Sequence, residues 1–176
     1  MIVLGRLALT LALVFSVASV VFLSLGVLWD RQDFRRNGYY AIYGFFLTTV
    51  IASAVLLQAF LKKDFNFGYV TENSDATLSV FYRIAGFWAG QQGSFLLWLL
   101  LLAITVIVIA VLDINRLERL TGGAVMVLGI IAAVFAALMV FDTGSNPFVK
   151  AEAGATPFGL NPLLLHPAMV LSLIHI

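Results

Sequence analysis

The chain has 176 residues, of which 62% are hydrophobic and 11% are charged, with a mean hydropathy of +1.05 and a formal net charge of +1. Soluble domains are typically about 45–50% apolar and about 25% charged, so one globular core of this size cannot hold the excess, and the composition predicts an integral membrane protein. The absence of cysteine excludes disulfides and thiolate metal sites, and the near-neutral net charge gives no indication of nucleic-acid binding.

Four apolar segments reach the length of about 20 residues that is needed to cross a hydrocarbon layer about 30 Å thick. They are residues 7–29, 39–61, 95–112 and 122–141. Every backbone amide in lipid must be paired within its own segment, so each segment is predicted to be a helix. The first one resembles a signal peptide, but it is too long for one and no small-residue cleavage site ends it. The predicted fold class is therefore all-α, a polytopic integral membrane protein with four transmembrane helices.

The fourth apolar segment is rich in small residues. Glycine and alanine let two helix backbones approach closely in lipid, which predicts that this helix packs tightly on a neighbour. The residues concerned are Gly129, Ala132, Ala133, Ala136 and Ala137.

The long connection between the second and third apolar segments, residues 62–93, changes character halfway. Its first half is polar and rich in turn-forming residues, whereas its second half carries Val80, Ile84, Phe87 and Trp88 at the spacing of one helical face. We expect a short amphipathic helix that lies on the membrane surface. A connector that packs on the helix bundle is the alternative.

The segment after the fourth span, residues 142–170, contains all four prolines and is too interrupted to cross the membrane. Four spans place it on the same side as residues 62–93, opposite residues 30–37 and 113–121. Each side carries five basic residues, so the rule that cytoplasmic loops are the more basic ones does not choose between them. The basic residues of the shorter loops are all arginine, and this favours a cytoplasmic position for those loops.

The sequence FWAGQQGSFLLW, residues 87–98, places polar groups directly before a leucine-rich span. Trp88 and Trp98 bracket a Gly-Gln-Gln-Gly-Ser turn at residues 90–94. The glycines allow close approach of another backbone or of a flat ligand, and the tryptophans offer planar faces, which suggests a binding surface for a flat amphipathic molecule. The alternative is an aromatic belt with Ser94 as the N-cap of the third span.

Two further residues are candidates for a ligand site. Arg83 either pairs with a carboxylate of a ligand or extends toward lipid headgroups. His166, in LNPLLLHPAMV, is a candidate ligand for a metal, although a lone histidine beside a proline is more often structural. No residue is assigned a catalytic role, and no metal-ligand set is predicted.

Three stretches resemble the CcmF/NrfE-type cytochrome c haem lyases. They are YVTENSDATLSVFYRIAGFWAGQQGSFLLW (69–98), GSNPFVK (144–150) and GLNPLLLHPAMV (159–170), and they occur in the order that this family has. The resemblance extends over nearly the whole chain from the second span onward. The first two spans are compatible with it but are not specific.

The resemblance implies a role in cytochrome c-type biogenesis at the periplasmic face of the bacterial inner membrane, where the long loops would lie. Haem b would be a transient substrate that is received from a haem chaperone and attached to an apocytochrome c, with a thiol-reduction partner. Membrane lipid is the remaining expected partner. The residues expected to contact haem are Trp88, Gly90, Gln91, Gly93, Trp98 and His166.

The chain departs from this family near its end. The family continues with His-Pro-x-x-x-x-His-Pro-Pro, whose second histidine is regarded as an axial haem ligand, whereas this chain has Ser172 at that position. Its last six residues, LSLIHI, are what one reading frame of a transposon-end sequencing adapter encodes. We therefore expect residues 1–170 to be the N-terminal transmembrane part of a haem lyase and residues 171–176 to be a non-native tail. Such a fragment is expected to attach no haem by itself.

Two other functional classes fit the residues alone. One is half of a secondary transporter, with the polar turn at residues 90–94 as the break in a discontinuous helix. The other is a non-catalytic membrane assembly or anchoring subunit.

Overall fold

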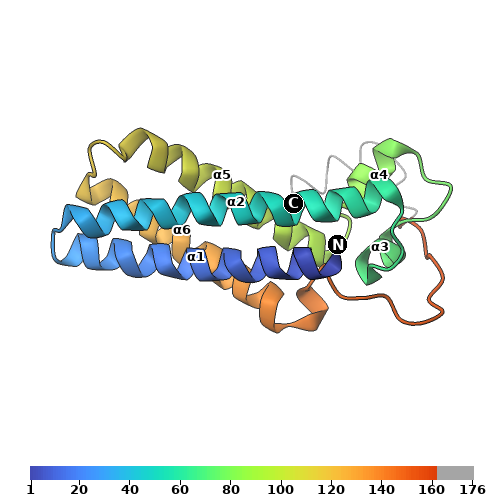
Figure 1. Ribbon diagram of the computed structural model, residues 1–176. Coiled ribbons are helices and arrows are strands. Elements are labelled where there is room, and N and C mark those ends of the chain that lie inside the picture. The colour runs from blue at the N-terminus through green and yellow to red at the C-terminus, as the bar shows by residue number, and fades with distance from the viewer. Residues whose placement is uncertain (162–176) are drawn as a thin grey trace.

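The computed structural model describes residues 1–161 of the chain (Figure 1). The helices are α1 Ile2–Leu28, α2 Gln32–Lys62, α3 Gly68–Asn73, α4 Val80–Gly86, α5 Gln91–Asp113, α6 Arg119–Phe141 and the short 3-10 helix η1 Thr143–Ser145. The candidate ligand His166 and residues 171–176, which were expected to be non-native, lie outside the described part.

The four long helices α1, α2, α5 and α6 are each long and apolar enough to cross a membrane. They confirm the predicted fold class, an all-α, multi-pass membrane protein. Each helix begins several residues before the apolar segment that predicted it. The reason is that polar and charged residues continue a helix freely in the headgroup region, which adds to the thickness of the hydrocarbon layer.

The four spans pack as a closed bundle. Helices α1 and α2 form an antiparallel hairpin, α6 packs on α1, and α5 bridges α2 and α6 (Figure 1). The small residues of α6 serve the predicted close approach, because Gly129 lies directly against α1 and Ala132 and Ala136 are fully buried. Ala133 and Ala137 are only half-buried.

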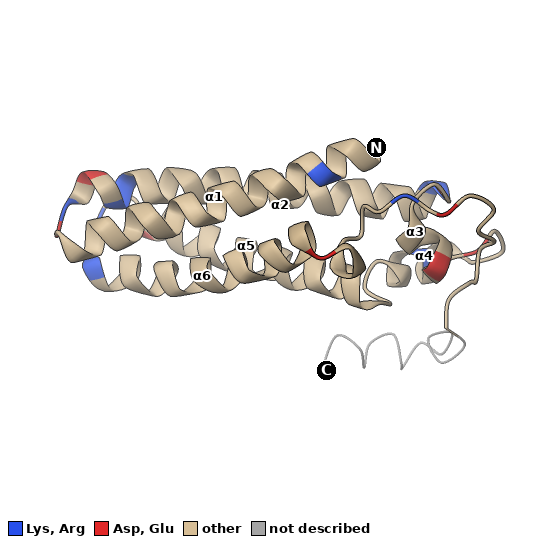
Figure 2. Ribbon diagram, turned by 90° about the horizontal axis from the view of Figure 1, so that it is seen from below, with Lys and Arg blue, Asp and Glu red and all other residues tan. Residues whose placement is uncertain are grey.

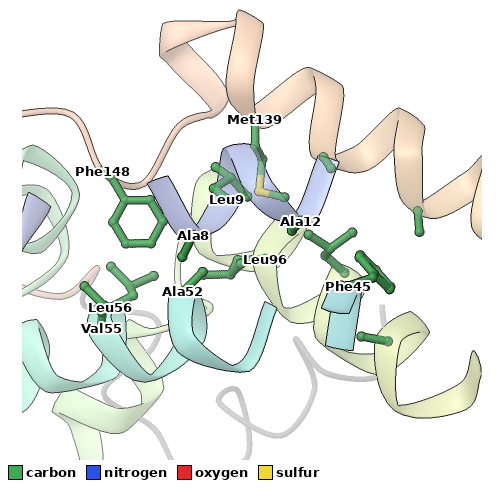
Figure 3. Packing of buried hydrophobic residues seen from close by; sticks show 14 of the residues in the cluster. Ala8, Leu9, Ala12, Phe45, Ala52, Val55, Leu56, Leu96, Met139 and Phe148 are labelled. Atoms are coloured by element: carbon green, nitrogen blue, oxygen red, sulfur yellow. The ribbon is translucent and has the colours of Figure 1, made fainter. Parts of the chain in front are cut away.

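The buried core runs along the bundle axis and draws on all four spans. Figure 3 shows its side chains converging at one end of the bundle, where Phe148 from the segment after α6 closes it. Several hydroxyl groups inside the spans are paired within their own helices, as apolar surroundings favour. Thr49, for example, donates from Oγ1 to the carbonyl oxygen of Phe45 at 2.8 Å.

The two ends of the bundle differ in their connections. The turns at residues 29–31 and 114–118 lie at one end, here called the short-loop end, whereas α3, α4, residues 142–161 and the N-terminus lie at the other, the long-segment end (Figure 1). The two long polar segments therefore share one side of the bundle, as predicted. Charged residues gather toward these two ends and leave the middle of the spans free of charge (Figure 2).

Side-chain pairs close the short-loop end. The Tyr39 hydroxyl donates to Oδ2 of Asp113 at 2.6 Å, and the same carboxylate accepts the backbone N–H of Glu118 at 3.1 Å, just before α6. Buried Arg35 donates from Nη1 to Oδ1 of Asp30 at 2.9 Å. The hydrogen bond and positive charge of Arg35 lower the pKa of Asp30.

The predicted amphipathic helix is present as α4, which is seven residues long and packs on α2. Only part of its expected apolar face is buried. Phe87 is 6% exposed and Trp88 is half-buried, whereas Val80 and Ile84 are 53% and 39% exposed. Helix α4 thus packs on the bundle and also leaves an apolar strip uncovered. Its position on a membrane surface remains a prediction.

Candidate functional site at the long-segment end

Tyr69, on α3, organises the turn that precedes α5. Its side chain is 3% exposed, and its hydroxyl oxygen accepts the backbone N–H of Gly90 at 2.9 Å. The carbonyl oxygens of Gly86 and Phe87 lie 3.2 and 3.3 Å away and compete for its hydrogen. Burial raises the pKa of Tyr69, so the hydroxyl keeps this hydrogen. The sequence analysis missed Tyr69, because nothing in the local pattern separates it from the other tyrosines.

The glycines of this turn are required by packing within the chain. A Cβ atom at Gly93 would overlap the carbonyl oxygen of Phe87 and the Tyr69 hydroxyl. A Cβ atom at Gly90 would lie 3.0 Å from the Tyr69 ring. The sequence allowed either another backbone or a flat ligand to lie close to these glycines. In the structure, atoms of the chain itself occupy that position. These contacts account for both glycines without a ligand.

Ser94 does not cap the third span, so that part of the sequence-based alternative is wrong. The N-cap of α5 is Gly90, with no side-chain cap bond. Because the Tyr69 contact holds Gly90 in an extended conformation, the helix begins at Gln91, and Ser94 is already inside its first turn. The Ser94 hydroxyl instead donates to the carbonyl oxygen of Trp88 at 3.0 Å.

The remaining predicted residues lie on different surfaces of this end. Trp88 is half-buried, and its indole Nε1 is buried without a hydrogen-bond partner within residues 1–161. Gln91 is exposed, and its Nε2 approaches Oγ of Ser145 at 3.4 Å, a long contact. Trp98 is 50% exposed on α5. The two tryptophans thus differ in setting, one packed beside the turn and one turned outward.

The Asn-Pro-Phe element after α6, residues 146–148, closes the long-segment end of the bundle and is here called the aromatic plug. Oδ1 of Asn146 accepts the backbone N–H of Phe148 at 2.8 Å, and this turn directs the Phe148 ring into the core, where it is fully buried. The Phe148 ring stands edge-on to the Phe67 ring, with 6.4 Å between the ring centroids. It also lies so close to Gly5 that a Cβ atom would not fit there. Nε of Arg6 donates to the carbonyl oxygen of Phe148 at 3.0 Å. The element therefore ties together α1, the segment before α3 and the segment after α6.

A short backbone pairing continues from this plug. Phe67 and Lys150 form an isolated antiparallel bridge. The N–H of Gly68 donates to the carbonyl oxygen of Val149 at 2.9 Å, and the N–H of Ala151 donates to the carbonyl oxygen of Asn66 at 2.8 Å. The two long segments are thus joined by main-chain hydrogen bonds, although nothing in their sequences predicts the pairing.

A polar cleft of about 300 Å³ opens between α3, the start of α5 and the segment after α6. Charged and amide side chains share its walls with backbone and apolar atoms. The polar side chains of this polar cleft come from Tyr69, Thr71, Glu72, Gln92, Thr143, Asn146, Lys150 and Glu152. The sequence analysis did not identify the cleft, since most of its walls come from the segment after α6.

Asp142 fixes the segment on the α6 side of the polar cleft. Its carboxylate accepts the Ser145 hydroxyl at 2.6 Å and the Gly144 N–H at 3.2 Å. These hydrogen bonds, that of Ser145 first, lower the pKa of Asp142. The same Ser145 hydroxyl meets Gln91, which links the end of α6 to the start of α5.

Within residues 1–161 there is no group of three or more His, Cys, Asp or Glu side chains that could hold a metal ion. Both histidines, His166 and His175, lie beyond these residues. The side chains of the described site offer hydrogen-bonding groups, charge and aromatic surface.

Comparison with known proteins gives relatives of one kind. The chain is 31% identical over 163 residues to the cytochrome c-type biogenesis protein CcmF of Haemophilus influenzae, which covers 92% of this chain and 25% of that protein. It is 32% identical to CycK of Rhizobium meliloti over 95% of the chain, and 29% identical to NrfE of Haemophilus influenzae over 86%. No family model matches the chain.

A solved structure of the cytochrome c haem lyase CcmF matches the fold with a TM-score of 0.76 and 25% identity. The match covers 97% of this chain and 26% of that one. The chain thus spans about a quarter of the length of the relatives that it matches. Because sequence and fold agree over most of its residues, the chain is a CcmF/NrfE-type polypeptide.

Proposed function

We propose that this chain forms part of a haem-handling surface in cytochrome c maturation, at its long-segment end. In this proposal haem b is a transient substrate. A haem chaperone delivers it at the periplasmic face of the bacterial inner membrane, and it passes to an apocytochrome c whose thiols a reducing partner maintains. The names of the relatives, which are cytochrome c-type biogenesis proteins and a haem lyase, support this class of function.

One observation carries the proposal to particular residues. The first turn of α5 presents the amide of Gln92 to the polar cleft, while the indole N–H of Trp88, four residues earlier, lacks a partner within residues 1–161. Haem combines a flat apolar ring with two carboxylates, so it needs aromatic surface and hydrogen-bond donors at one place. Lys150 supplies a positive charge on the wall of the same cleft.

The six predicted residues take different parts in this proposal. Trp88, Gln91 and Trp98 offer side chains for direct contact with haem or with the protein that delivers it. Gly90 and Gly93 act indirectly, because they allow the turn to fold onto Tyr69. His166 remains a candidate contact in the part of the chain that follows residue 161.

The transporter alternative gains no support from the spans. A discontinuous helix near the bilayer midplane is typical of transporter sites. Helices α1, α2, α5 and α6 are each continuous between their bounds, and the polar turn lies at the end of the bundle.

The proposal is tested in a full-length CcmF relative whose matching quarter is exchanged for this chain and which still matures c-type cytochromes. Trp88→Leu and Trp98→Leu are compared with Trp29→Leu, which changes an exposed tryptophan at the short-loop end. We expect less covalently bound haem in cytochromes made with Trp88→Leu, a smaller loss with Trp98→Leu, and no loss with Trp29→Leu. Unimpaired maturation in both of the first two variants would contradict the proposal.

A further inference from the structure

An apolar groove of about 280 Å³ lies between α2, α4 and α5. Its walls include Ser53, Ala54 and Leu57 of α2, Ile84 of α4 and Leu97 of α5. The hollow exists because two consecutive residues of α2, Ser53 and Ala54, are small. Trp88 lines the groove as well, but the other walls play no part in the proposed haem surface.

The groove faces away from the bundle core and contains unpaired polar groups. Val50 and Ala54 on its walls are exposed, so it opens on the outer surface of the bundle, beside the apolar spans. Ser53 is 7% exposed, and neither its Oγ nor the Trp88 Nε1 has a hydrogen-bond partner within the described residues. Unpaired donors are costly in apolar surroundings, so the groove favours an occupant that is mostly apolar and carries a hydrogen-bond acceptor.

Two cations stand at the aqueous end of this groove. Nη1 of Arg83, the neighbour of Ile84, donates to the carbonyl oxygen of Leu61 at 2.8 Å. Leu61 lies one helical turn beyond Leu57, which lines the groove, and Lys62 follows it. One turn is about 5.4 Å along the axis, so the guanidinium of Arg83 is held about one turn beyond the groove, and Lys62 is the next residue of α2. Within residues 1–161 neither forms an ion pair, and Nε of Arg83 is buried without a partner.

We propose that this groove and the two cations form a binding site for one anionic phospholipid. An acyl chain fills the groove, an ester carbonyl accepts from the unpaired Ser53 hydroxyl, and Arg83 and Lys62 hold the phosphate. The exposed apolar residues of α4, Val80, Phe81 and Ile84, fit this depth, because an amphipathic helix lies where headgroups meet hydrocarbon. The charge favours this occupant over a neutral apolar helix, which would leave both cations unmatched. The proposal does not depend on haem handling.

The test uses native mass spectrometry of the full 176-residue chain, released from micelles that contain equal amounts of phosphatidylglycerol and phosphatidylcholine. We expect one retained phosphatidylglycerol in preference to phosphatidylcholine. Each cation near an anionic lipid surface contributes enough to change the affinity about fivefold, so Arg83→Gln should weaken retention by about that factor. Ala54→Phe should fill the groove and abolish retention of the lipid.

Arg36→Gln is the matched control, because it removes the same charge from an exposed site at the short-loop end. Its lipid retention should equal that of the parent chain, and Arg83→Gln alone decides the matter if Ala54→Phe does not fold. Equal retention of the two lipids, or retention that Arg83→Gln leaves unchanged, would overturn the proposal. Displacement of the bound lipid by an equimolar amount of haemin would also overturn it and assign the groove to haem.

Discussion

The two ends of the bundle hold their polar groups in different ways. At the short-loop end, buried charged side chains are paired with other side chains, as Arg35 is with Asp30 and Asp113 is with Tyr39. At the long-segment end, aromatic rings and hydrogen bonds to the backbone make the structure, the amide of Gln92 and the amino group of Lys150 line the polar cleft, and the indole N–H of Trp88 has no partner within residues 1–161. The first end is thus committed to joining the spans, whereas the second combines a folded scaffold with unused binding groups.

The largest expected effect is the loss of the aromatic plug at the long-segment end. Phe148→Ala removes a fully buried ring that touches α1 and Phe67, so it should lower the free energy of unfolding by about 3–5 kcal/mol. Denaturant titration in micelles measures the change. Phe158→Ala is the control, because Phe158 is 83% exposed and its loss should change little. Equal effects of the two variants would mean that the plug does not hold this end together.

A smaller loss is expected where the turn folds onto Tyr69. Gly93→Ala places a methyl group against the Phe87 carbonyl oxygen and the Tyr69 hydroxyl, and relief of this overlap should cost about 1–3 kcal/mol. Gly123→Ala serves as the control in α6, since nothing lies within 4 Å of a Cβ atom there. Thermal unfolding of both variants compares them. If Gly93→Ala is as stable as Gly123→Ala, the described turn is wrong.

At the short-loop end, Tyr39→Phe should cost about 1–2 kcal/mol, because it removes the hydroxyl donor from a buried carboxylate and keeps the ring. Asp113 still accepts the N–H of Glu118, which limits the loss. Tyr43→Phe is the matched control on the same helix, half-buried and outside this pairing. The free energy of unfolding is measured for both variants. Equal values would contradict a stabilising role of the Tyr39–Asp113 hydrogen bond at the short-loop end.

The smallest expected effect is a dependence on pH at Asp142. Its hydrogen bonds lower its pKa, so they stabilise the folded chain at neutral pH, and this contribution is lost as the pH falls through the lowered pKa. Ser145→Ala removes the main donor and should shift the pKa back toward its ordinary value. The stability difference between the parent chain and Ser145→Ala should therefore be largest near neutral pH and shrink in acid. A difference that is independent of pH would contradict the assignment.

The four spans were predictable because a single backbone segment in lipid can pair its own N–H and C=O groups only as a helix. A long apolar run has to be a helix, so 7–29 led to α1 and 95–112 to α5. Where water can pair with backbone groups, this constraint does not apply. The early starts of the helices and the whole of α3 were missed for that reason. The wrong assignment of Ser94 as an N-cap arose in the same way, because Gly90 becomes the N-cap only through its contact with Tyr69.

The candidate site was predictable only in its residue types. The sequence singled out Trp88, Gly90 and Gly93 from their residue types, but both glycines are packed against Tyr69 of α3, some twenty residues earlier in the chain, and Gly93 also lies against the Phe87 carbonyl oxygen. The Asn-Pro-Phe element was noted through resemblance alone, and its role became visible when Phe148 was found against Gly5, at the other end of the chain. Contacts between distant segments cannot be inferred from local pattern.

The most direct test of the difference between the two ends is their exposure on opposite faces of the membrane. The chain contains no cysteine, so Ala153→Cys at the long-segment end and Asn115→Cys at the short-loop end are each unique thiols at exposed positions. A maleimide that cannot cross membranes is added to intact spheroplasts that produce either variant. We predict that it labels Ala153→Cys at once and Asn115→Cys only after permeabilisation. Labelling of Asn115→Cys in intact spheroplasts, with Ala153→Cys protected, would contradict a periplasmic haem-handling end.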